Sequence, residues 1–61
     1  MNGNAIKKIR FSKGFTQTEL AKKLKMDRSY LSSIENNRVT PSIKTLEKIA
    51  SELGVSLKKF F

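Results

Sequence analysis

The 61-residue sequence contains no cysteine, no histidine and no tryptophan. Without these residues, disulfide bonds and the usual Cys or His metal sites are excluded. Nucleophilic catalysis by Cys or His is excluded as well. We further predict a protein that is not an enzyme and has no cofactor or metal. No run approaches the ~20 apolar residues that cross a bilayer, and residues 1–4 lack the apolar core of a signal peptide. The expected location is the cytoplasm, with no membrane partner.

Acidic residues are scarce: five Asp and Glu stand against 13 Lys and Arg, which gives a net charge of +8. The excess lies mainly in residues 1–40, which hold nine basic and three acidic side chains. A small domain with this charge favours a polyanionic partner. Two alternatives are a Lys-rich surface that only contacts water and a cationic peptide that lies on membranes. The second usually has one continuous amphipathic helix, whereas this sequence has capping signals between short helical segments.

The length allows a single domain over residues 1–61, and the apolar spacing is that of helices, with no strand alternation. Five helical segments are expected, over residues of about 4–12, 16–25, 27–36, 43–53 and 57–61. Thr16 and Glu19 have the spacing of a capping box, and Asp27 and Ser42 are suitable N-caps. The fold class is therefore all-α. The expected core is apolar and follows the helical period: Ile6, Ile9, Phe15, Leu20, Leu24, Met26, Leu31, Ile34, Leu46, Ile49, Leu53, Val55 and Leu57.

The segment 27–36 differs from the other helical segments in its outward face. Its only aliphatic residues are Leu31 and Ile34, and the face away from them carries Ser29, Ser32, Ser33 and Asn36. Such residues have poor helix propensity, but their short side chains let a helix approach another surface closely. In a basic protein, such a face of short polar side chains favours a helix that enters the DNA major groove. The alternative is a polar helix with no partner.

Two stretches and the turn between them resemble a known family. FTQTELA (residues 15–21), a short turn and SYLSSIEN (residues 29–36) are similar to the helix-turn-helix of the Cro and phage-repressor family, also called the XRE family. The downstream PSIKTLEKIASELGVS (residues 41–56) is similar to that family too. The resemblance implies a compact five-helix, lambda-repressor-like domain whose second and third helices form the helix-turn-helix. It also implies a transcriptional regulator, more often a repressor than an activator, that binds palindromic double-stranded DNA as a homodimer.

The resemblance carries specific roles onto residues of this sequence. The implied base contacts are Arg28, Ser29, Ser32 and Ser33. The implied phosphate contacts are Thr16 and Gln17 at the second helix, Asn36, Asn37 and Arg38 after the third, and the weaker candidates Lys13 and Lys44. Arg10 and Glu35 occupy the positions of a structural ion pair; the alternative is two independent surface charges.

Several positions depart from the family or stay open. Lys25 stands where the family usually has glycine, and Asp27 stands where it usually has Ser or Thr. Tyr30 is either a packing residue or a phosphate contact. The residues Leu57, Phe60 and Phe61 are candidates for a dimer patch. The two phenylalanines could instead pack on the core, or be exposed because a longer protein was truncated. The alternative function is a protein-interaction module of the same fold, such as an antitoxin-like partner; no small-molecule site is expected.

Overall fold

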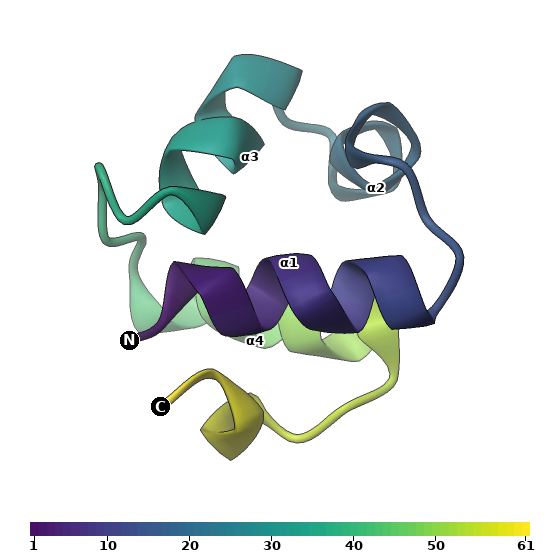
Figure 1. Cartoon of the computed structure of the whole chain (residues 1–61). Coiled ribbons are helices and arrows are strands. Elements are labelled where there is room, and N and C mark those ends of the chain that lie inside the picture. Colours follow the sequence, from purple (N-terminus) through teal and green to yellow (C-terminus); the bar gives the residue numbers. More distant parts are fainter.

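The computed structural model describes residues 1–61 and contains four α-helices and a 3-10 turn. They are α1 (Gly3–Ser12), α2 (Gln17–Leu24), α3 (Arg28–Glu35), α4 (Ile43–Leu53) and η1 (Leu57–Phe60). Helix α1 runs through the middle of the molecule, with α2 and α3 on one side, η1 on the other and α4 behind it (Figure 1). The all-α prediction is confirmed. The fifth expected helix is instead a 3-10 turn of four residues, since so short a segment cannot build a regular α-helix.

The start of α2 follows the capping signal in the sequence. The Thr16 hydroxyl accepts a hydrogen bond from the Glu19 backbone N–H at 3.1 Å, and the Glu19 carboxylate accepts one from the Thr16 N–H at 2.8 Å. The Thr16 backbone N–H also holds the pKa of Glu19 below its ordinary value, because it stabilises the carboxylate. The predicted capping box is therefore confirmed, and it fixes where α2 begins.

The turn between α2 and α3 places Lys25 where a glycine would be easier to accommodate. Lys25 has φ 56° and ψ 45°, the left-handed conformation, which disfavours a residue with a Cβ by about 1–2 kcal/mol. Asp27 lies at the N-cap position of α3 with an extended backbone, but its side chain accepts no capping hydrogen bond. The expected side-chain cap is therefore wrong. The first turn of α3 has no side-chain cap, and the Asp27 carboxylate beside it is exposed.

The core consists of aliphatic residues from all four α-helices and one aromatic residue, Phe60. Its buried members are Ile6, Leu20, Ala21, Leu24, Leu31, Ile34, Leu46, Ile49, Ala50, Leu53 and Phe60. The predicted core residues Ile9, Phe15, Met26, Val55 and Leu57 are partly buried and pack against this cluster. No helix combines the length and the apolar character needed to cross a bilayer.

The three candidates for a dimer patch, Leu57, Phe60 and Phe61, differ in their exposure. Phe60 is 0% exposed, and Leu57 packs against the core. The reason is that the chain end folds back on α1, where the Asn2 N–H donates to the Phe60 carbonyl at 2.6 Å. Phe61 is 66% exposed, and the dimer patch stays a prediction.

Helix α1 begins in close contact with the end of α3. The Gly3 N–H donates to the Asn37 side-chain oxygen at 2.8 Å, and Asn37 itself adopts a left-handed conformation with φ 60°. Gly3 is buried, and a Cβ at this position would overlap the Ile34 carbonyl oxygen and lie 2.9 Å from that of Glu35. This close approach fixes the end of α3 against the first turn of α1.

Candidate nucleic-acid interface

Helix α3 is anchored by one face and presents short polar side chains on the other. Leu31 and Ile34 are fully buried. Among the predicted base contacts, Arg28 and Ser29 are exposed, and Ser32 and Ser33 are half-buried. All four belong to the same eight-residue helix, on which Ser29, Ser32 and Ser33 point away from Leu31 and Ile34 and Arg28 lies at the edge of that face.

A buried ion pair holds the end of α3 against the end of α1. The Arg10 Nε donates to Glu35 Oε2 at 2.7 Å, and Nη2 donates to Oε1 at 3.1 Å. The third donor, Arg10 Nη1, binds the Phe15 carbonyl at 2.9 Å. The two side chains are only 7% and 1% exposed, so they are not independent surface charges. The bidentate geometry fixes both the distance and the orientation of the two helices.

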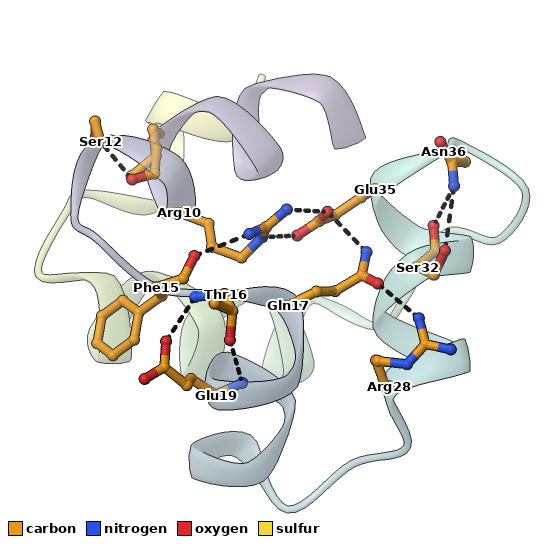
Figure 2. A network of polar contacts seen from close by, with 11 residues as sticks. Arg10, Ser12, Phe15, Thr16, Gln17, Glu19, Arg28, Ser32, Glu35 and Asn36 are labelled. Carbon is orange, nitrogen blue, oxygen red and sulfur yellow. Dashed lines mark hydrogen bonds and ion pairs between the residues drawn. The ribbon is translucent and has the colours of Figure 1, made fainter.

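Gln17, the first residue of α2, lies between this ion pair and the start of α3. Its amide nitrogen donates to Glu35 Oε1 at 3.1 Å, and its amide oxygen accepts from Arg28 Nη1 at 3.1 Å. Figure 2 shows the resulting chain of contacts, which runs from Arg10 through Glu35 and Gln17 to Arg28. Sequence reasoning placed Gln17 only at a phosphate and missed both contacts.

The start of α2 also offers backbone donors to an anion. The first N–H groups of a helix have no acceptor within it, and the capping box uses only that of Glu19. The N–H groups of Gln17 and Thr18 are therefore free, and the helix dipole favours a negative charge beside them. Thr16, the other expected phosphate contact here, is exposed. Its hydroxyl already accepts the capping bond, so it has its proton left to donate.

The predicted phosphate contacts after α3 differ in which donors remain free. The Asn36 amide nitrogen donates to the Ser32 carbonyl at 2.9 Å and to the Ser32 hydroxyl at 3.3 Å. Asn37 uses its oxygen at Gly3, which leaves its amide N–H groups for an acceptor outside the chain. Asn37 and the exposed Arg38 therefore have side-chain N–H groups free to bind a phosphate. The Asn36 amide would first have to break its hydrogen bonds with Ser32.

Lys13 and Lys44 lie outside α2 and α3. Lys13 follows the last residue of α1, and Lys44 lies in the first turn of α4. Both side chains are exposed and form no ion pair, since the only ion pair in the protein joins Arg10 and Glu35. The structure therefore joins Gln17, Arg28 and the ion pair in one network, and it leaves these two lysines as separate charges.

One open hollow of about 430 Å³ lies beside the network, lined by Arg10, Phe11, Gly14, Phe15, Thr16 and Gln17. Each of the three nitrogens of the Arg10 guanidinium already donates a hydrogen bond, to Glu35 or to Phe15. No buried side-chain polar atom anywhere in the protein lacks a partner. The hollow therefore has no unused buried group with which to recognise a small molecule.

Two short helices joined by a tight turn, the second of which presents a polar face, define a helix-turn-helix protein. The sequence matches the helix-turn-helix family model over residues 6–60, and the chain belongs to this family. The resemblance and the fold class predicted from the sequence are thereby confirmed.

Individual relatives agree with this assignment. The chain is 46% identical over 55 residues to the immunity repressor protein of Bacillus phage phi105, which covers 90% of this chain and 38% of that protein. It is 50% identical over 58 residues to the HTH-type transcriptional regulator SinR of Bacillus subtilis (strain 168), with 93% and 52% covered. A crystal structure of SinR in complex with DNA superimposes with a TM-score of 0.89 at 45% identity, and covers 97% of this chain and 98% of that one. The chain spans 38% and 52% of the length of these two curated relatives.

Proposed function

We propose that the chain is a sequence-specific, double-stranded DNA-binding domain of a transcriptional repressor, with α3 in the major groove. The observation that carries this proposal is the polar face of α3, where exposed Arg28 and Ser29 continue into Ser32 and Ser33. Short polar side chains on an anchored helix suit close approach to base edges. The DNA-bound structure of the related SinR supports the same function.

The basic surface would supply the part of the affinity that does not depend on sequence. Lys13, Arg38 and Lys44 are exposed cations, and the free N–H groups at the start of α2 would bind one phosphate oxygen. Together with Thr16, Gln17, Asn36 and Asn37 they would set the position of α3 on the duplex. This binding is non-enzymatic and uses no cofactor.

Selection from a random duplex library tests the proposal directly. The purified chain is incubated with the library at ~150 mM salt, where non-specific binding is weak, and the bound fraction is sequenced. We expect enrichment of one palindromic motif. If a folded sample enriches nothing, the proposal is wrong, and the protein-interaction module becomes the better account of the fold.

Arg28 is expected to carry the largest share of base recognition. Its guanidinium can bind the O6 and N7 atoms of a guanine in bidentate fashion, so Arg28→Ala should weaken the selected site by about 1–3 kcal/mol and relax the preference at one base pair. Binding isotherms with the selected duplex and its single-base variants measure both effects. Arg38→Ala is the matched control and should weaken all duplexes to a similar degree. If Arg28→Ala weakens random DNA as much as the selected site, Arg28 does not read a base.

We also propose that the chain binds its site as a homodimer, with half-sites about 34 Å apart on one face of the duplex. Of the three residues first assigned to a dimer patch, only Phe61 is exposed. Phe61→Ala should therefore leave the fold intact and weaken self-association. Sedimentation with and without the selected duplex measures it. A 1:1 complex on a duplex that holds both half-sites would exclude the dimer.

A further inference from the structure

Asn2 and Gly3 form the only Asn–Gly pair in the sequence. In such a pair the backbone nitrogen of the second residue can attack the side-chain amide carbon of the first, and glycine hinders this attack least because it has no Cβ. Asn2 is the N-cap of α1, where its side-chain oxygen accepts from the Asn4 N–H at 3.0 Å. Gly3 must lack a Cβ, because one would overlap the Ile34 carbonyl oxygen. The start of α1 therefore needs, for two separate reasons, two residues that can react with each other.

The folded chain holds both reacting groups apart. The Gly3 N–H donates to the Asn37 side-chain oxygen at 2.8 Å, and Gly3 is buried, so its nitrogen is not free to turn toward the Asn2 side chain. The backbone N–H of Asn2 donates to the Phe60 carbonyl at 2.6 Å. Figure 1 shows the N-terminus between the segment that follows α3 and the C-terminus. The attack therefore requires the start of α1 to separate from these neighbours.

We propose that Asn2 is a deamidation site that is closed while α1 is docked and opens when its first turn separates from the end of α3. In the open chain the Gly3 nitrogen forms a bond to the Asn2 Cγ. The proton of that nitrogen passes to the side-chain nitrogen of Asn2, which leaves as ammonia and gives a succinimide ring. Water then opens the ring at either carbonyl and yields aspartate or isoaspartate. The inference does not depend on the proposed DNA-binding function.

The two products have different consequences for the fold. Aspartate keeps the main chain unchanged, and its carboxylate can still accept from the Asn4 N–H at the start of the helix. Isoaspartate carries the main chain through the former side chain, which lengthens it by one carbon atom. The hydrogen bonds of residues 2 and 3 to Phe60 and Asn37 can then no longer form together. A transient opening of α1 thereby becomes a permanent loss of its contact with the end of α3.

Asn37→Gly tests how the site is controlled. Glycine readily adopts the left-handed backbone of position 37, with φ 60°, so this variant removes the acceptor of the Gly3 N–H without straining the loop. One hydrogen bond of this kind favours the closed state by a factor of about 2 to 12, so the deamidation rate should rise by about 2- to 12-fold. Incubated samples are digested with trypsin. Fragmentation of the N-terminal peptide by mass spectrometry then separates conversion at Asn2 from conversion at Asn4.

Asn36→Ala is the matched control, because Asn36 is exposed and its amide nitrogen donates to Ser32 within α3. It should leave the rate unchanged. Unfolding the wild-type chain in urea should accelerate the reaction by at least about tenfold, since every molecule is then open. Circular dichroism checks that both variants are folded during incubation. If Asn37→Gly converts at the wild-type rate, or the folded wild-type chain converts as fast as the unfolded one, the inference is overturned.

The proposed loss of docking has its own readout. The aspartate and isoaspartate products are separated by chromatography, and each is compared with the unreacted chain by thermal unfolding and by hydrogen exchange of the Gly3 amide. The isoaspartate product should unfold at a lower temperature and lose the protection of this amide, whereas the aspartate product should keep both. An isoaspartate product with the midpoint and the protection of the unreacted chain would overturn the permanent loss of the contact between α1 and α3.

Discussion

Replacing Glu35 with alanine is expected to lower the free energy of unfolding by about 3–5 kcal/mol, because it leaves the Arg10 guanidinium buried without its counter-charge. Both side chains are almost completely buried, and the carboxylate also accepts the Gln17 amide. A domain of this size has a total stability of roughly 3–9 kcal/mol. The variant should therefore be largely unfolded or close to it, which urea and thermal unfolding followed by circular dichroism will measure.

Two further variants show whether the loss arises from the ion pair. Glu52→Ala removes a glutamate that is exposed on α4, and it should change stability by less than about 0.5 kcal/mol. Arg10→Met combined with Glu35→Leu removes both charges and should recover much of the loss, since apolar replacement of a buried pair is often neutral. If Glu35→Ala lowers stability by less than about 1 kcal/mol, the pair behaves like one on the surface.

Most of the fold was predictable because its signals are local. Helix α4 has the expected bounds, since Ser42 accepts from the Thr45 N–H at one end and Gly54 takes φ 68° at the other. The helical period alone puts Ile43, Leu46, Ile49 and Leu53 on one face of α4, although Ile43 is 56% exposed. Periodicity gives the direction of a side chain, but it does not show whether a neighbouring element reaches that turn.

The end of the chain shows where local signals are insufficient. Phe60 and Phe61 are chemically identical, yet one is fully buried and the other is exposed. Their difference comes from the return of the chain to α1, where Phe60 meets Asn2. That contact joins residues almost a whole chain apart, so no short pattern could assign the two rings.

In the candidate site, too, some features follow from local sequence patterns and others depend on tertiary contacts. The outward position of Ser29 and the exposure of Arg28 follow from the position of Leu31 and Ile34 on one helix. The contacts of Gln17 do not, because they require its side chain, at the start of α2, to lie between the start and the end of α3. Their arrangement depends on how the helices cross, which the sequence pattern does not specify.

Gly3→Ala is expected to destabilise the protein by about 3 kcal/mol or more, at the upper end of what overpacking produces. The added methyl group would overlap the Ile34 carbonyl oxygen and press on that of Glu35. Both are backbone atoms of α3, so no side-chain rotation can relieve the contact. Separation of α1 from α3 would also break the hydrogen bond from Gly3 to Asn37. Thermal unfolding should show a midpoint lowered by at least about 12 °C.

Asn4→Ala provides the matched comparison, because Asn4 lies next in the same turn of α1 and is exposed. Alanine has the higher helix propensity there, so this variant should be as stable as the wild-type chain or slightly more stable. The contrast between adjacent positions isolates the close approach of α1 to α3 from any general effect of alanine in the first turn. If both variants unfold at the wild-type temperature, α1 and α3 can separate at this point without loss. The Arg10–Glu35 ion pair would then hold the two helices together without help from the contact at Gly3.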